Sequence, residues 1–190
     1  MKESTLVKAP RAAAPPPHEL QAFGMVVDMP IALAEAARRE GADNLNQLLA
    51  DTISLRDLYR KHHWQASGPN FYQLHLLFDK HYREQDELVD AIAERIMQLG
   101  GVSVAMAADV ADITLIPRPP KGRERTTEQL ARLLHAHEVV LEEARAMGRY
   151  ADRHGDVGTG DLIVSSIVRK NETQVWFVAE HRTAAPAEVE

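Results

Sequence analysis

The sequence contains no cysteine, and this absence excludes several kinds of chemistry. Disulfide bonds, thiolate metal ligands and cysteine nucleophiles all require a thiol, so a metal site would have to use imidazole and carboxylate. The chain also lacks an apolar run of about 18 residues, which a membrane-spanning helix needs. Its N-terminus lacks the apolar core of a signal peptide. We therefore expect a soluble, cytoplasmic protein with no membrane partner.

An excess of positive charge is missing as well. The 190 residues include 22 Lys and Arg against 28 Asp and Glu, which gives a net charge of −6 at pH 7. A body of this charge should not bind nucleic acid nonspecifically. In residues 1–17, Lys2, Lys8 and Arg11 are the candidate DNA contacts, and association with the nucleoid would depend on them. A tail without function is the favoured alternative, because a useful polybasic arm usually carries more charge.

No alternating pattern typical of β-strands appears, whereas helical periodicity recurs along the chain. A proline opens and a glycine closes a short helix over residues 30–41. The connection over residues 100–126 is too long for a simple turn and contains another short helix within residues 102–112. Thr126 or Thr127 would cap the helix that follows this connection. Four long helices are predicted, over residues 43–67, 70–99, 126–153 and 159–181.

This order of elements predicts an all-α fold. Four long helices with one extended crossover match a ferritin-like four-helix bundle, with a short helix in the crossover between helices two and three. Three regions are expected: a flexible tail at 1–29, the bundle at 30–182 and a short C-terminal tail at 183–190.

Imidazole and carboxylate side chains gather on the helix over residues 70–99. At 100° per residue, His75, Asp79, Asp90 and Glu94 fall within roughly a quarter of its circumference, at the border of the apolar stripe. His63 lies just upstream. Iron, manganese and zinc all accept these ligand types. An acidic helix flank with incidental histidines is the alternative, but it does not explain the spacing.

One chain cannot complete a metal site with these residues. Asp79 and Asp90 are about 16 Å apart along the helix axis, whereas the ligands of one ion lie within about 2–2.6 Å of it. The four positions are symmetric about a point between residues 84 and 85. Two antiparallel copies of the helix would therefore place His75 opposite Glu94 and Asp79 opposite Asp90. We predict a two-fold dimer with two identical sites, in which Arg83 also pairs with Asp86 across the axis.

The segment KHHWQASGPNFYQLHLLFDKHYREQDELVDAIAERIMQLGG closely resembles the signature of Dps, the DNA-binding proteins from starved cells, which are miniferritins. The resemblance implies a shell of twelve subunits that oxidises Fe(II), preferably with hydrogen peroxide, and stores the ferric oxide as protection against oxidative stress. It implies that His63, His75 and Asp79 of one chain and Asp90 and Glu94 of its neighbour form the catalytic ferroxidase centre. Zinc or manganese could occupy the same ligands.

The resemblance implies two further roles. Trp64 matches the family's tryptophan beside the ferroxidase centre, where it would intercept oxidising radicals; a plain core role is the alternative. Asp152 and Asp161 match the carboxylates that line the three-fold pores through which iron passes. Asp156 adjoins the middle pore position, which Val157 occupies here. Helix capping by Asp156 or Asp161 is the competing interpretation.

Two other functions fit parts of the sequence. A larger ferritin or bacterioferritin would build a di-iron site inside one bundle from Glu-x-x-His motifs, and the sequence contains none. A nucleoid-associated, DNA-compacting protein with secondary metal binding is the second alternative. Besides the tail, it would use a basic loop that contains Arg118, Lys121, Arg123 and Arg125.

Overall fold

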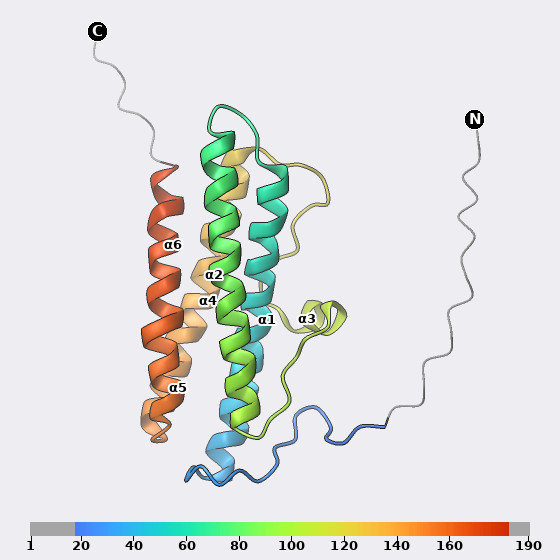
Figure 1. The fold of residues 1–190 in the computed structure, drawn as a ribbon, viewed down its shortest axis with the longest axis vertical. Helices are drawn as coiled ribbons and strands as arrows, with labels where there is room; N and C mark the ends of the chain where they lie inside the picture. Colours follow the sequence, from blue (N-terminus) through green and yellow to red (C-terminus); the bar gives the residue numbers. More distant parts are fainter. Residues whose placement is uncertain (1–17, 183–190) are drawn as a thin grey trace, which may run out of the picture.

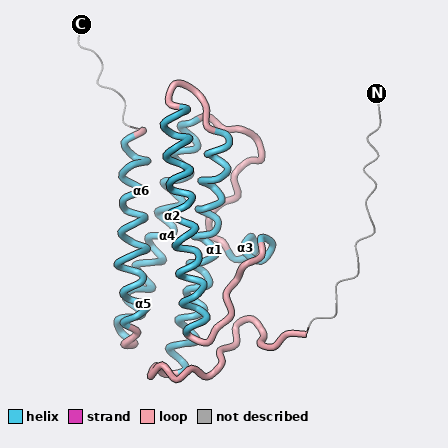
Figure 2. Tube along the Cα trace, viewed as in Figure 1, coloured by secondary structure: helices cyan, strands magenta, loops and turns pink. Residues whose placement is uncertain are grey.

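The computed structural model describes residues 18–182, and its regular elements are all helices (Figures 1 and 2). Three long helices and a composite fourth one run along the length of the molecule, while a short helix lies to one side, next to the first (Figure 1). The predicted all-α, ferritin-like bundle with a short crossover helix is confirmed. The elements are α1 (Glu35–Gln65), α2 (Phe71–Gln98), α3 (Ala107–Ile113), α4 (Thr126–Arg153), α5 (Val157–Asp161), η1 (Leu162–Val168) and α6 (Arg169–Glu180).

The first long helix is continuous where we expected two helices. α1 passes through Gly41 without a break, so the predicted separation of residues 30–41 from residues 43–67 is wrong. Gly41 is buried, and a Cβ atom at this position would lie 3.3 Å from Cδ1 of Leu99. The glycine therefore serves close packing between α1 and the end of α2, and its helix-terminating tendency is overridden by tertiary contacts.

α4 spans the predicted range but begins differently from our expectation. Its N-cap residue is Arg125, which makes no side-chain capping hydrogen bond. The hydroxyl of Thr126 instead donates to the carbonyl oxygen of Ser67 at 3.0 Å, and that of Thr127 donates to Glu128. Capping by Thr126 or Thr127 is thus wrong. Thr126 ties the start of α4 to the turn between α1 and α2.

The fourth long helix is built from three consecutive segments. α5 is a short α-helix, η1 has the wider π-helical turn, and α6 returns to α-helix. The side-chain amide of Asn171 donates to the carbonyl oxygen of Ile167 at 2.8 Å, beside the π segment. π segments are rare and often mark functional positions in helices.

The segment before α1 packs against the end of α2. The amide nitrogen of Val27 donates to the carbonyl oxygen of Gly100 at 2.8 Å, and the side chain of Gln21 donates to the same oxygen at 2.9 Å. The buried guanidinium of Arg38 donates to the carbonyl oxygens of Val27 and Leu99. Residues 21 and 27, which we assigned to a flexible tail, therefore belong to the folded unit. Residues 1–17 and 183–190, with Lys2, Lys8 and Arg11, lie outside the described residues.

The crossover between α2 and α4 is fastened to α1 at two points. The side chain of Asn46 donates to the carbonyl oxygen of Val102 and accepts from the amide of Val104. The fully buried carboxylate of Asp51 accepts hydrogen bonds from the hydroxyl of Thr114 and from the amides that follow it. Among the helices of residues 18–182, none is both long and apolar enough to cross a membrane.

Candidate metal centre

His63 and His75 bind each other's backbone across the contact between α1 and α2. Nδ1 of His63 lies 2.8 Å from the carbonyl oxygen of His75, and Nδ1 of His75 lies 3.0 Å from the carbonyl oxygen of His63. The two imidazole rings stack, with centroids 3.8 Å apart and planes inclined by 20°. Gly68, with a φ of +90°, lies in the turn that brings α2 back along α1.

These contacts decide which ring nitrogens are free for a metal. A carbonyl oxygen only accepts hydrogen bonds, so both Nδ1 atoms must carry the hydrogen. In neutral imidazole, Nε2 then keeps its lone pair. Metal-binding histidines are commonly oriented in this way, by a hydrogen bond from the other ring nitrogen to a carbonyl group. His63 and His75 are therefore arranged to bind a metal through Nε2.

Asp79, one turn beyond His75, is held between two guanidinium groups. Nη1 of Arg60 lies 3.4 Å from Oδ1 of Asp79, and Nη2 of Arg83 lies 2.6 Å from Oδ2. Arg60 also stacks on the ring of Tyr82, with its guanidinium carbon 3.5 Å from the ring centroid. The two arginines supply positive charge where a metal ion would bind Asp79. Both arginines therefore compete with an incoming metal ion for the carboxylate of Asp79.

Asp90 and Glu94 lie three turns further along α2, and both side chains are exposed. The axial distance from Asp79 to Asp90 is about 16 Å in a regular helix, so the two acidic residues cannot share an ion with Asp79 of the same chain. Asp90 borders a surface pocket of about 500 Å³. Within residues 18–182, no three His, Asp or Glu side chains gather closely enough to hold a metal ion. The two-fold pairing of half-sites stays a prediction.

The charges that we expected to meet across the dimer axis have partners within the chain. Arg83 pairs with Asp79, and Asp86 accepts a hydrogen bond from Arg56 at 3.0 Å. A contact between Arg83 and Asp86 across the axis is therefore not needed to pair these charges, and it stays a prediction.

Trp64, next to His63 in the chain, is 71% exposed. A plain core role within one subunit is therefore wrong. Its ring centroid lies 5.9 Å from the guanidinium carbon of Arg60, so the indole stands beside the Asp79 half-site. The role of Trp64 as a trap for radicals stays a prediction.

The three candidate pore carboxylates have different surroundings. Asp152 and Asp161 are exposed, at the ends of α4 and α5. Asp156 is buried and caps α5: its carboxylate accepts hydrogen bonds from the amide and the hydroxyl of Thr159. Arg95 donates to the same carboxylate at 2.6 Å. These contacts favour the capping role for Asp156, and a pore role stays a prediction for Asp152 and Asp161.

A chain of polar side chains occupies the interior of the bundle. His81 contacts the hydroxyl of Tyr59, which contacts Nε2 of His137, and Nδ1 of His137 contacts Asn171. All four residues are buried. Burial lowers the pKa of His137 to about 4 and that of His81 to about 3, and burial raises the pKa of Tyr59. These side chains are therefore neutral at pH 7.

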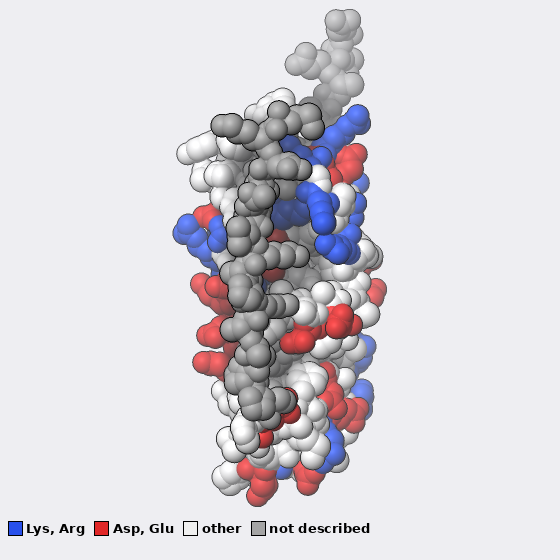
Figure 3. All heavy atoms as spheres, turned by 90° about the vertical axis from the view of Figure 1, so that its right-hand side faces the viewer, with Lys and Arg blue, Asp and Glu red and all other residues white. Residues whose placement is uncertain are grey.

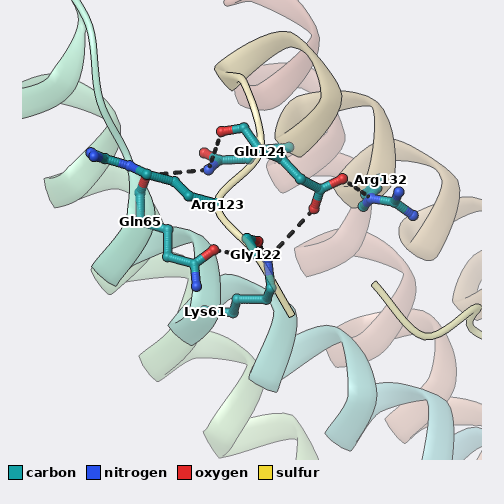
Figure 4. A network of polar contacts seen from close by, with 7 residues as sticks. Lys61, Gln65, Gly122, Arg123, Glu124 and Arg132 are labelled. Carbon is teal, nitrogen blue, oxygen red and sulfur yellow. Dashed lines mark hydrogen bonds and ion pairs between the residues drawn. The ribbon is translucent and has the colours of Figure 1, made fainter. Parts of the chain in front are cut away.

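The basic loop before α4 is partly committed to internal contacts. Arg123 donates to the carbonyl oxygens of Gln65 and Ala66, and Glu124 lies between Lys61 and Arg132 (Figure 4). Burial opposes ionisation of Glu124, but the hydrogen bond from Arg132 and the charge of Lys61 outweigh it and lower its pKa. Lys and Arg gather mainly near the upper end of this side of the molecule (Figure 3). Arg118, Lys121 and Arg125 are exposed.

Sequence reasoning missed the arginines at Asp79 and the interior polar chain. The four-residue interval between Asp79 and Arg83 is a known pairing distance on a helix and could have revealed one of these contacts. Arg60 and the partners of Tyr59 come from other helices, so no local pattern indicates them.

Comparison with known proteins shows that the chain is similar to one family of helical proteins. A model of the ferritin-like domain family matches residues 42–186. A nutrient stress-induced DNA-binding protein from Nostoc sp. is 32% identical over 160 residues, which cover 84% of this chain and 86% of the Nostoc protein. A Kitasatospora aureofaciens protein named "uncharacterized protein in bpoA2 5′ region" is 54% identical over 127 residues, or 67% of this chain and 85% of that protein.

Among solved structures, DpsC from Streptomyces coelicolor is similar over nearly the whole chain. It superposes with a TM-score of 0.88 at 48% sequence identity, and the alignment covers 90% of this chain and 100% of DpsC. The two proteins therefore share their fold over most of this chain.

Proposed function

Because this chain belongs to the Dps family of ferritin-like proteins, we propose that it is a cytoplasmic ferroxidase and iron-storage protein. It oxidises Fe(II), preferably with hydrogen peroxide, at centres shared by two subunits, and stores the ferric product inside a shell of twelve subunits. The observation that carries this proposal is the reciprocal hydrogen bonding of His63 and His75. It leaves both Nε2 atoms ready for a metal beside Asp79.

The chemistry follows from the ligand types. Imidazole and carboxylate both bind Fe(II), and the carboxylates of Asp79, Asp90 and Glu94 favour the harder Fe(III) product. Peroxide accepts one electron from each of two Fe(II) ions, its O–O bond breaks, and with two protons its oxygen atoms leave as water. Because both electrons come from bound iron, no hydroxyl radical is released. This two-electron stoichiometry is the basis of the proposed protection against oxidative stress.

The shared centre can be tested by mixing two inactive variants. Variant one carries His63→Ala and Asp79→Ala, and variant two carries Asp90→Ala and Glu94→Ala. Each variant alone lacks one half of every centre. In a mixed dimer one of the two centres combines both intact halves, so random pairing restores about a quarter of the wild-type centres. Two differently tagged chains, produced together and purified through both tags, supply the mixed particles.

The rate of Fe(III) formation after anaerobic addition of Fe(II) and peroxide then measures the share of active centres. We expect background rates for each variant alone and about a quarter of the wild-type rate for the mixture. Wild-type rates in either variant alone would reject these ligands. A mixture that stays at background would reject the two-fold pairing. The particle mass in solution tests the twelve-subunit shell separately.

The route of iron into the shell is a second part of the proposal. Asp152 and Asp161 are the exposed carboxylates at the turn between the third and fourth long helices, and we propose that they attract Fe(II) toward a three-fold pore. Asp152→Asn and Asp161→Asn together should slow iron uptake into the shell. Replacing Asp109 of α3, an exposed carboxylate away from this turn, is the matched control.

DNA binding is a second candidate function, favoured by the similarity to a relative that is named as DNA-binding. Arg118, Lys121 and Arg125 offer exposed positive charge, and Lys2, Lys8 and Arg11 lie in the tail. Gel-shift titrations at increasing salt distinguish the cases, because each phosphate contact adds to the salt dependence. The absence of retardation at low salt would remove this function.

A further inference from the structure

Tyr59 has an environment that a merely structural phenol does not require. We propose that Tyr59 is an internal electron donor to the iron centre and that His137 accepts its proton. This role rests on the proposed ferroxidase function and deepens it. It applies when a centre holds a single Fe(II) ion and peroxide therefore lacks its second electron.

The hydroxyl of Tyr59 lies between two buried imidazoles. Its oxygen is 2.6 Å from Nε2 of His137 and 3.1 Å from Nδ1 of His81. Tyr59, His81 and His137 each have 0% relative exposure. Both imidazole rings meet the phenol ring edge-on, at centroid distances of 5.6 Å and 5.1 Å. These contacts therefore shield the phenol oxygen from solvent.

The direction of each hydrogen bond follows from Asn171. Its side-chain nitrogen donates to the carbonyl oxygen of Ile167, so its oxygen faces His137 and accepts from Nδ1 of that ring at 2.8 Å. With the hydrogen on Nδ1, the neutral ring of His137 offers a lone pair on Nε2. The hydroxyl of Tyr59 must then donate to His137, and Nδ1 of His81 must donate to Tyr59.

With the hydrogen bonds in this order, the proton of Tyr59 can move to His137 along the existing contact, over less than one bond length. When Tyr59 loses an electron, its O–H bond breaks and an N–H bond forms at Nε2 of His137, across the existing contact. The imidazolium stays bonded to the oxygen of Asn171, and the phenoxyl oxygen accepts hydrogen bonds from both rings. A network of this polarity stabilises the oxidised state without moving a side chain.

Tyr59 is also near the proposed centre. It precedes His63 by one turn of α1, about 6 Å along the helix axis. On the neighbouring helix, the ring centroid of Phe78 lies 6.0 Å from that of Tyr59, and Phe78 directly precedes Asp79. Tyr59 therefore lies within one helical turn of His63 along α1, and its aromatic neighbour Phe78 is the residue before Asp79 on α2.

The electrons and atoms balance over two steps. In the first, Fe(II) and Tyr59 each give one electron to peroxide, whose O–O bond breaks, and two protons from solvent complete two water molecules. Fe(III), a tyrosyl radical and protonated His137 remain. In the second step a later Fe(II) reduces the radical, and the proton returns from His137 to Tyr59. Two Fe(II) ions are still consumed per peroxide, and hydroxyl radical is avoided in between.

The test uses the full-length assembly, loaded anaerobically with one Fe(II) per centre, mixed with peroxide and frozen rapidly for electron paramagnetic resonance. Wild type should give an organic radical whose hyperfine structure collapses when tyrosine is ring-deuterated. Tyr59→Phe should lose this signal and release more hydroxyl radical to a spin trap. Tyr82→Phe, which removes a phenol that stacks on Arg60, is the matched control and should keep the signal.

Further measurements keep the outcomes distinct. His137→Gln removes the proton acceptor and should also lower the radical yield, which tests the proposal through a second residue. Particle mass and Co(II) binding report whether each variant keeps its assembly and its centre. An unchanged radical in Tyr59→Phe, or no radical in a wild type that oxidises Fe(II), would overturn the role of Tyr59 alone. A wild type that does not oxidise Fe(II) with peroxide would overturn the proposed function and this role together.

Discussion

Arg95 in the last turn of α2 donates a hydrogen bond of 2.6 Å to Asp156, the residue that caps α5. Both side chains are largely buried, at 16% and 6% exposure. Arg95 also donates to the hydroxyl of Thr159 at 2.9 Å. The end of the helix that carries Glu94 is thereby fixed to the turn that carries the candidate pore carboxylates.

Replacing Asp156 with alanine should destabilise the protein strongly. The change removes the α5 cap and leaves the guanidinium of Arg95 buried without its anion, and breaking a buried pair in this way costs roughly 3–5 kcal/mol. Asp156→Asn should be milder, because asparagine also caps helices and still accepts from Thr159. Thermal unfolding measures both. Asp152→Ala, an exposed carboxylate nearby, is the control, and a melting temperature lowered equally in all three would contradict the prediction.

Replacing Arg60 or Arg83 with glutamine should strengthen metal binding. Each guanidinium pairs with Asp79 and competes with a metal ion for that carboxylate. Because an ion pair at the protein surface is worth about 0.2–1 kcal/mol, affinity should rise by up to about fivefold per substitution. Calorimetric titration with Co(II), carried out without peroxide, measures this change in affinity.

Arg56→Gln is the matched control for these two variants. Arg56 also lies on α1 and pairs with Asp57 and Asp86 rather than with Asp79. Its loss should leave Co(II) affinity near that of wild type. Weaker binding after loss of Arg60 would mean that the arginine orients Asp79 for the metal instead of competing with it.

Glu143 should make stability depend on pH. Burial, together with the charge of Asp51 and a hydrogen bond to it, raises the pKa of Glu143 from 4.5 to about 8. The folded protein therefore keeps a proton that the unfolded chain releases above pH 4.5. The stability that this proton contributes is complete below pH 4.5 and is lost as pH rises toward 8.

Glu143→Gln keeps a hydrogen-bond donor for Asp51 and cannot ionise. The variant should therefore gain stability relative to wild type as the pH rises from 5 to 9, when compared in melting temperature at each pH. Glu142→Gln, at the exposed neighbouring position, should show no such trend. A difference between wild type and Glu143→Gln that stays constant across this range would refute the assignment.

Gly100→Ala should weaken the junction between α2 and the segment before α1. Gly100 has a φ of +87°, and a Cβ atom there would collide with the carbonyl oxygen of Val27. Strain in this backbone region alone costs about 1–3 kcal/mol in a residue other than glycine, and the collision adds to it. Denaturant unfolding quantifies the loss. A Cβ atom at Gly122 meets nothing within 4 Å, so Gly122→Ala should unfold at the wild-type midpoint.

The parts of the fold that could be predicted are those governed by local signals. The predicted range of α4 agrees with the structure, and the break at residues 68–70 follows from Gly68 and Pro69. The errors come from tertiary contacts. Gly41 remains inside α1 because Leu99 packs against it, and Thr126 bonds to Ser67 instead of capping α4.

The part of the candidate site that lies on a single helix could be predicted from the sequence. His75 and Asp79 on one face, with His63 upstream, follow from periodicity and spacing. The reciprocal bonds of His63 and His75 require the turn between two helices, and periodicity does not describe that turn. The partners of Tyr59 lie on α2 and α4, so its role depends on packing between elements that are distant in sequence.

The anchoring of the crossover to Asn46 and Asp51 has a consequence for the order of folding. Both anchors lie on α1, 56 to 65 residues before their partners in the crossover. Contacts of this range form only after the intervening chain has closed on itself, which slows folding. The crossover is therefore positioned by residues of α1. Shortening it would remove the donors that Thr114, Leu115 and Ile116 provide to the buried carboxylate of Asp51 and leave it the donor from Gln47 on α1.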